Sequence, residues 1–275
     1  MTWRTHLAFL VVGLFGNFAS QAEDLLCSSD NIPGTSRPWG WFTGFAEAPN
    51  GDLFVAGDYD IFTDEGLRYL YRVENSGAVS LLLEEDQVVP GGDGVFGAID
   101  NRTFQVLDSG ALLFTAEIKG EDKDAIFLWT EAEGVVEIVR DGDAEPLTGA
   151  GTFRSAEIVG IVDEEQFYLQ DSGDVKALYV WSRSNGLQVA REVGETLADG
   201  RTITDFSSFR VNASGQVRFT GQHDQPLPGG FGEALFADGP NEELRVLLNE
   251  GDGIAGFGEP VAFIDRVELN DDGFR

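Results

Sequence analysis

The sequence predicts an all-β fold, a propeller-like array of four-stranded blades, with about four complete units and a partial fifth. Two separate phrases recur along the chain with a common period of roughly 55 residues. The segments within each copy alternate between apolar and polar residues and are bounded by turn residues, which is typical of short strands. After residue 22, no long apolar stripe of helical period with capping residues occurs. Together these observations favour stacked sheets over a helical fold.

The first recurring phrase is a strand, a tight turn and a second strand. It reads "GFAEAPNGDLFVAG", "FQVLDSGALLFTA" and "FRVNASGQVRFTG", and a fragment, "RVELNDDGFR", ends the chain. The turn glycines stand 59, 105 and 58 residues apart: Gly51, Gly110, Gly215 and Gly273. The wide middle gap holds a further copy, "GIVDEEQFYLQ", in which Asp163-Glu164-Glu165 replaces the glycine turn. Glycine suits such turns because it adopts a positive φ without steric cost.

The second phrase is an apolar run, a polar turn, another apolar run and then a carboxylate. It occurs as "YLYRVENSGAVSLLLEED", "AIFLWTEAEGVVEIVRDGD", "ALYVWSRSNGLQVAREVGE" and "ALFADGPNEELRVLLNEGD". One aromatic residue keeps step in all four copies, with gaps of 56, 52 and 57 residues: Tyr71, Phe127, Tyr179 and Phe236. Two independent phrases with one period indicate a structural repeat.

Each unit is expected to hold four short strands, which in the fourth unit are "SFRVN", "QVRFTGQ", "EALFA" and "LRVLLN". Runs such as "AIFLW" and "ALYVW" are apolar at successive positions, so both faces of these strands need cover. Sheets stacked face to face provide that cover, and a propeller is the usual arrangement. An irregular sandwich or a solenoid of hairpins is the alternative architecture. The expected units span about 39–86, 96–141, 153–193 and 207–250, with the partial fifth at 262–275.

Residues 1–22, "MTWRTHLAFLVVGLFGNFASQA", have the features of a secretory signal peptide. Arg4 precedes a short apolar core, and Ser20-Gln21-Ala22 offers small residues for cleavage. An uncleaved anchor is the alternative, although this core is short for a bilayer span and no other stretch approaches transmembrane length. We therefore expect an exported protein, periplasmic, secreted or on the cell surface, with a repeat domain at residues 23–275.

The composition indicates an acidic globular domain. The 275 residues include 48 acidic and 18 basic side chains, which gives a formal net charge of −30, and 42% are hydrophobic. Such a surface repels nucleic acid and anionic lipid headgroups, so neither is expected as a partner. The charge suits a salty medium, in which self-repulsion is screened, and it equally serves solubility. Cys27 is the only cysteine, which excludes an intramolecular disulfide.

The loops between successive units carry the candidate binding residues. Each loop opens on a carboxylate and reaches a glycine a few residues later; the carboxylates are Asp30, Asp86, Asp143, Glu195 and Asp252. Equivalent loops of similar units emerge on one face, so these residues are expected on a common circle. The favoured interpretation is that each carboxylate accepts backbone N–H bonds and fixes its own loop. A Ca²⁺ site is the alternative, although no complete calcium-loop signature occurs and "DYDIFTDEG" breaks after two spaced aspartates.

No residue stands out as catalytic. His223 is the only histidine after the signal peptide, and we expect it as an exposed bystander in the polar loop "GQHDQPLPGG". The sequence holds no G-x-S-x-G elbow, no H-E-x-x-H motif and no cysteine cluster, so no thiolate or histidine-rich metal site is expected. Glycoside hydrolysis needs only two carboxylates and stays open in so acidic a chain.

The copies "VNASGQVRF", "VLDSGALLF" and "ELNDDGF" resemble the NxxGxxAF tandem repeat of bacterial secreted proteins, as do "DGDAEPLTGAGTF" and "EGDGIAGFGEP". The resemblance covers about residues 25–275. It implies an exported, propeller-like repeat protein, often with a C-terminal surface-anchoring segment, and it brings no established activity. The third copy departs from the pattern because it lacks the turn glycine. Since the sequence ends inside a fifth copy, we expect either a longer natural product or a partner that fills the gap.

These observations predict an exported, non-catalytic repeat protein that binds extracellular glycans or surface proteins through loops on one face. Two alternatives stay open at this point. One is a carbohydrate-active enzyme, a glycoside hydrolase or lyase, of propeller architecture. The other is a structural component of the cell surface.

Overall fold

In the computed structural model, the described residues form sixteen β-strands and no helix. The structure describes residues 41–58, 68–91, 93–120, 123–146, 151–163, 165–171, 177–225, 233–239, 242–253, 260–261 and 264. Sheet 1 contains β1 (Trp41–Glu47), β2 (Leu53–Asp58), β3 (Tyr69–Val73) and β4 (Val79–Glu84). Sheet 2 contains β5 (Val95–Val106), β6 (Leu112–Lys119), β7 (Lys123–Thr130) and β8 (Gly134–Arg140). Sheet 3 contains β9 (Ala156–Asp163), β10 (Gln166–Asp171), β11 (Ala177–Ser182) and β12 (Gly186–Glu192). Sheet 4 contains β13 (Ile203–Val211), β14 (Val217–His223), β15 (Ala234–Gly239) and β16 (Glu242–Asn249).

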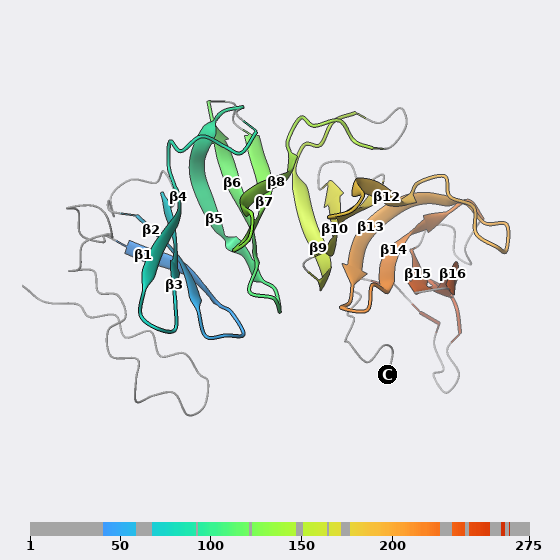
Figure 1. Cartoon of the computed structure of the whole chain (residues 1–275). Helices are drawn as coiled ribbons and strands as arrows, with labels where there is room; N and C mark the ends of the chain where they lie inside the picture. The colour runs from blue at the N-terminus through green and yellow to red at the C-terminus, as the bar shows by residue number, and fades with distance from the viewer. Residues whose placement is uncertain are drawn as a thin grey trace, which may run out of the picture.

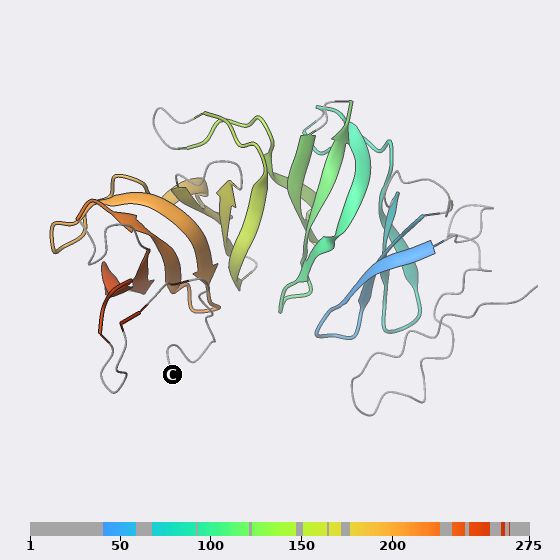
Figure 2. The same ribbon diagram turned by 180° about the vertical axis from the view of Figure 1, so that it is seen from behind.

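Every sheet is an antiparallel meander, because strands adjacent in sequence are hydrogen-bonded neighbours throughout. Figures 1 and 2 show the four sheets in chain order along an open arc, from sheet 1 at one end to sheet 4 at the other. The predicted all-β array of four-stranded units is therefore confirmed. None of the described residues belongs to a helix long and apolar enough to cross a membrane. The expected signal peptide, Asp30 and all of the partial fifth unit except Ile264 lie outside the described residues.

The four sheets repeat one pattern of strand pairing. The aromatic residue that recurs in the sequence lies at the same place on the third strand of every sheet, opposite an apolar residue of the second strand. The pairs are Val55 with Tyr71, Phe114 with Phe127, Leu169 with Tyr179, and Phe219 with Phe236. In each sheet a register shift between the third and fourth strands falls immediately before this aromatic residue. The period read from the sequence is thus a period of the pairing itself.

Successive sheets pack face to face, and three apolar clusters fill the space between them. One cluster lies between sheets 1 and 2, the second between sheets 2 and 3, and the third between sheets 3 and 4. Strand β7 shows the principle, since Phe127 belongs to the first cluster while Ile126 and Leu128 belong to the second. The expectation that "AIFLW" needs cover on both faces is therefore correct. Burial of each large side chain of this kind stabilises the fold by roughly 1.5–3 kcal/mol.

At two of the three junctions, the first strands of neighbouring sheets come close together. Strand β1 contacts β5, and β9 contacts β13. Gly160 on β9 makes the second approach possible, because a Cβ at this position would lie 2.3 Å from Cβ of Val211 and 2.8 Å from its carbonyl oxygen. Only a residue without a side chain fits there.

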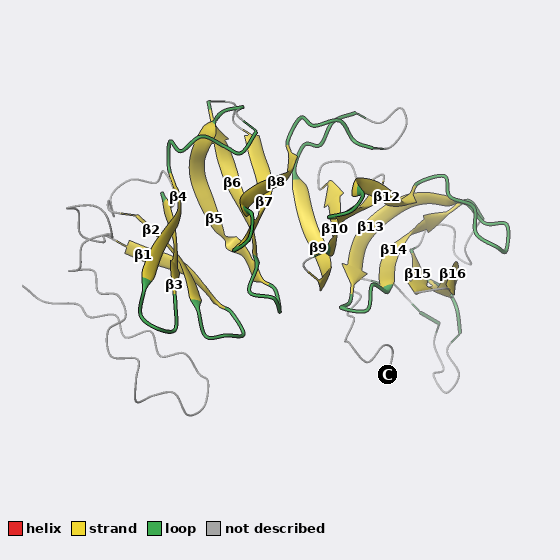
Figure 3. Ribbon diagram, viewed as in Figure 1, coloured by secondary structure: helices red, strands yellow, loops and turns green. Residues whose placement is uncertain are grey.

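A meander places successive turns at alternate ends of each sheet, so the arc has two different faces. The hairpins after the first and third strands form the turn face: 48–52, 74–78, 107–111, 131–133, 183–185 and 212–216. The connections from one sheet to the next form the loop face: the described parts of 85–94, 141–155, 193–202 and 250–261. Figure 3 shows the β4–β5 and β8–β9 connections along the upper side of the arc and the turns of sheet 1 along its lower side.

Candidate functional site

The connections of the loop face share one backbone arrangement, and three predicted carboxylates occupy the same position in it. The N–H groups of Asp143, Glu195 and Asp252 each donate to the carbonyl three residues earlier, over 3.0, 3.2 and 3.1 Å. Their own carbonyl groups accept an N–H from the far side of the loop, over 3.0, 3.0 and 2.9 Å. These residues therefore hold equivalent places, although nothing brings their side chains into one group.

Asp86 does not hold this place, and the sequence alignment of the loops is wrong there by one residue. Gln87 makes the equivalent pair of hydrogen bonds, with the carbonyl of Glu84 and the N–H of Phe96. Asp86 instead takes the preceding position, with a φ of 66°, where the other three loops have a glycine of positive φ. Aspartate is one of the few residues with a side chain that tolerates this backbone, so the change of residue is accommodated.

The side chains of Asp143 and Asp252 fix their loops, as the favoured interpretation predicts, whereas the carboxylate of Glu195 lies 3.6 Å from Nη1 of Arg191. Asp143 Oδ2 accepts the backbone N–H of Arg140 at 2.9 Å, and Asp252 Oδ2 accepts that of Asn249 at 2.8 Å. Gln87 makes the same contact with Glu84, more weakly, at 3.3 Å. Carboxylates engaged in this way stabilise a loop conformation.

Asp86 has a different task, the pairing of a lysine. Lys119 Nζ lies 2.8 Å from a carboxylate oxygen of Glu85 and 2.9 Å from one of Asp86. Hydrogen bonds to Glu85 and then to Asp86 raise the pKa of Lys119 well above its usual range. Glu85 also pairs with Arg68 at 2.7 Å, so this end of the β4–β5 connection is a small ion-pair network.

The described part of the chain contains no cluster of side chains that would support the calcium hypothesis. No group of three or more His, Cys, Asp or Glu side chains is placed there to hold a metal ion. The candidate carboxylates lie on separate connections, and residues 59–66 of "DYDIFTDEG" lie outside the described residues.

A polar cleft of about 530 Å³ opens on the loop face between the β4–β5 and β8–β9 connections. Glycines and Pro90 contribute to its walls. Its charged lining comprises Asp93, Lys123, Glu137, Arg140 and Asp143. Of the described sequence candidates, only Asp143 lies in this lining.

Arg140 joins the two walls of the cleft. It ends strand β8 and is 9% exposed. Its guanidinium donates to both carboxylate oxygens of Glu137, over 3.0 and 2.6 Å, and to the backbone carbonyl of Asp93 over 2.8 Å. Because its backbone N–H binds Asp143 as well, this one residue positions both connections.

A second set of carboxylates lies at the junction of sheets 2 and 3. Burial raises the pKa of Asp141, and repulsion from Asp124 and Asp171 adds to this effect. Asp171 is 4% exposed. Its Oδ1 accepts the backbone N–H groups of Arg154 and Ser155, which directly precede β9. Tyr179 donates its hydroxyl to Glu145 over 2.6 Å, and burial together with this bond raises the pKa of Tyr179. These contacts anchor the β8–β9 connection to sheet 3.

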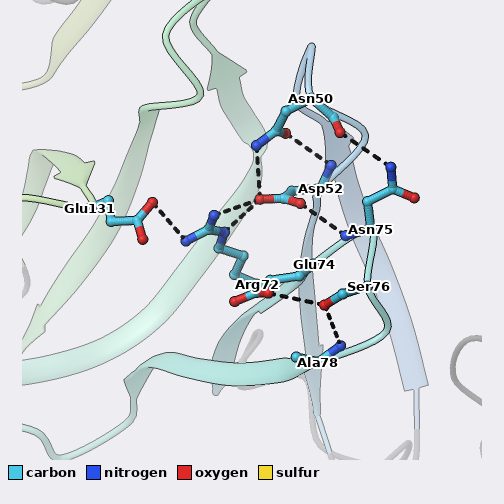
Figure 4. A network of polar contacts seen from close by, with 8 residues as sticks. All are labelled: Asn50, Asp52, Arg72, Glu74, Asn75, Ser76, Ala78 and Glu131. Atoms are coloured by element: carbon cyan, nitrogen blue, oxygen red, sulfur yellow. Dashed lines mark hydrogen bonds and ion pairs between the residues drawn. The ribbon is translucent and has the colours of Figure 1, made fainter.

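Another polar network lies on the turn face and joins sheets 1 and 2 (Figure 4). Asp52 accepts from Arg72 Nε at 2.8 Å and from the N–H of Asn75 at 2.9 Å. Burial alone would raise the pKa of Asp52, but these donors outweigh it and hold that pKa below its usual range. Arg72 also pairs with Glu131 of sheet 2 at 3.2 Å and lies over the ring of Trp129. Arg72 thus links Asp52 of sheet 1 with Glu131 of sheet 2, so the network serves stability.

His223 differs from its prediction as an exposed loop residue. Strand β14 extends to this residue, and its ring is partly buried. Nε2 lies 3.0 Å from the Asn249 side-chain oxygen, and Phe236 packs edge-on against the ring. The strand continues because its pairing with β13 runs as far as Ile203, a contact that the local sequence does not reveal.

Neither the protein-family models nor the curated protein sequences with which the chain was compared gave a match. The assignment of a site therefore depends on geometry. Sequence reasoning missed Asp93, Lys123, Glu137 and Arg140 as lining residues. A usable signal was present, because Arg140 is one of few cations in an acidic chain and stands directly before a predicted loop.

Proposed function

We propose that this protein is an exported, non-catalytic binding protein that takes up extracellular glycans or surface proteins at its loop face. The single observation that carries the proposal is the polar cleft between two connections of that face, whose walls Arg140 joins. Export is supported by the signal-like residues 1–22.

The volume of the cleft lies within the range of small-molecule binding sites. Small-molecule sites are clefts of about 300–1,000 Å³ with a few well-placed polar groups. Hydrogen bonds within the chain already hold both walls, so a ligand would lose little free energy in ordering them.

The repeat also supports recognition at this face. The position of Arg140 is occupied by Glu84, Glu192 and Asn249 in the other three connections, as the shared hydrogen bonds define it. One backbone frame thus presents four different side chains, whereas the buried aromatic position stays nearly constant. Loops on a rigid scaffold are common carriers of binding function.

A screen of glycans, polysaccharides and surface-protein extracts, read for both binding and cleavage, tests the proposal. Asp93→Ala changes an exposed lining side chain whose backbone carbonyl keeps its bond to Arg140, so the fold should persist. We expect binding to weaken about tenfold, the cost of roughly one hydrogen bond to a charged group. Asp108→Ala, an exposed change on the turn face, should leave binding unaltered.

The screen also separates the alternatives. Release of shortened saccharides would replace the binding proposal with the enzymatic one. Retention of no glycan and no protein would favour a structural surface component. Equal loss of binding in both variants would place the site away from the cleft.

A further inference from the structure

The guanidinium of Arg140 is engaged by groups of the cleft itself. The Arg140 side chain is 10% exposed, and its three nitrogens donate to Glu137 and to the carbonyl of Asp93. The bidentate carboxylate of Glu137 neutralises the charge of this guanidinium, which weakens its attraction for a second anion. Arg140 therefore shapes the cleft without making it an anion site.

The remaining lining is acidic on balance. Asp93 and Asp143 are exposed, Glu137 is partly buried, and the cationic side chains are Lys123 and Arg140. The whole chain carries a formal charge of −30, so the surrounding field is negative as well. Such a field repels carboxylated or sulfated ligands at low ionic strength.

The chemistry that fits this lining is a ligand rich in hydroxyl donors. Carboxylates accept hydrogen bonds from hydroxyl groups, and such charge-assisted bonds are stronger than neutral ones. A cleft of about 530 Å³ lies within the volume range of small-molecule sites, so its size suits a short saccharide.

We infer that the cleft binds uncharged, hydroxyl-rich saccharides and discriminates against acidic ones. This inference rests on the proposed function and names the ligand class of the same site.

Matched tetrasaccharides that differ only at C6 test the inference on the intact protein. The pairs are β-1,4-mannotetraose with β-1,4-tetramannuronate, and β-1,4-glucotetraose with β-1,4-tetraglucuronate, each titrated by calorimetry in 20 mM and 500 mM NaCl. For a pair whose members bind, we expect the dissociation constant of the neutral sugar in 20 mM NaCl to be at least about tenfold lower than that of its acidic counterpart. The ratio of the two dissociation constants should be smaller in 500 mM NaCl, because salt screens the repulsion of the acidic sugar.

A lining variant links the preference to the cleft. Asp93→Asn removes one negative charge and keeps the size of the side chain, so it should narrow the ratio between neutral and acidic sugars. Asp108→Asn removes the same charge on the turn face and should leave the ratio nearly as it was. Equal narrowing in both variants would mean that the net charge acts, and would overturn the assignment to the cleft.

The outcomes separate this inference from the proposal beneath it. Tighter binding of an acidic tetrasaccharide would overturn the inference and leave glycan binding intact. Binding of a surface protein with no glycan would also overturn it, while the proposed function would stand. Binding of neither glycan nor protein would contradict both.

Discussion

At the scale of single residues, the same side-chain type performs different tasks, and its backbone position decides which one. Asp143 accepts the N–H of its own loop, Asp86 pairs with Lys119, and Asp52 pairs with Arg72 of a neighbouring strand in sheet 1. The sequence predicted the first task because an aspartate at the start of a glycine-containing loop is a local signal. It did not predict the third, since Arg72 stands 20 residues from Asp52 and only the strand pairing brings them together.

Replacement of Asp143 by alanine tests the role of the loop carboxylates. Loss of the bond to the Arg140 N–H should lower the free energy of unfolding by about 1–2 kcal/mol, as expected for a part-buried hydrogen bond to a charged group. Thermal unfolding with and without calcium measures the change, which should not depend on the cation. Asp108→Ala is the matched control and should change stability little. A large calcium-dependent rise in the melting temperature of the wild type, absent from Asp143→Ala, would instead establish a metal site.

At the scale of the strands, the sequence reveals what depends on local period and hides what depends on pairing. The hairpin turns at Gly51, Gly110 and Gly215 adopt the predicted positive φ, because the need for glycine is local. The register shift before each buried aromatic residue was not predicted. Strand β5 was also unexpected in its length of 12 residues, with a shift between Asp100 and Gln105. Such bulges follow from the hydrogen-bond ladder between strands, which hydrophobic patterns do not encode.

The approach of β9 to β13 makes a prediction at this scale. Gly160→Ala places a Cβ against Val211 and should destabilise the protein by about 1–3 kcal/mol, as overpacking of a tight contact does. Chemical denaturation measures this free energy. Gly151→Ala is the control, because nothing lies within 4 Å of a Cβ at that position. Val211→Ala should not restore the stability of the double variant, because alanine keeps the Cβ, Cα and carbonyl oxygen that the new methyl group meets. Equal effects of the Gly160 and Gly151 changes would contradict the close approach.

At the scale of the whole molecule, the four sheets cover one another's apolar faces. Their stacking also places the connections between sheets on one face, the loop face. The architecture was predictable because it repeats with one period in the sequence. The cleft was not, because its lining comes from β7, β8 and two connections that are separate in the sequence and meet only in the folded chain. Asp143 could be chosen as a candidate from the sequence of its loop. Asp93 and Arg140 could not, because the hydrogen bond that joins them links residues 47 positions apart.

Hydrogen–deuterium exchange, with and without the tightest-binding ligand from the screen, tests the central claim most directly. The claim is that ligands bind at the loop face, in the cleft between the β4–β5 and β8–β9 connections. We expect the ligand to slow exchange at residues 85–96 and 141–145, and to leave the turns at 48–52, 107–111 and 212–216 as they were. Protection confined to those turns, with unchanged exchange in the two connections, would contradict the account.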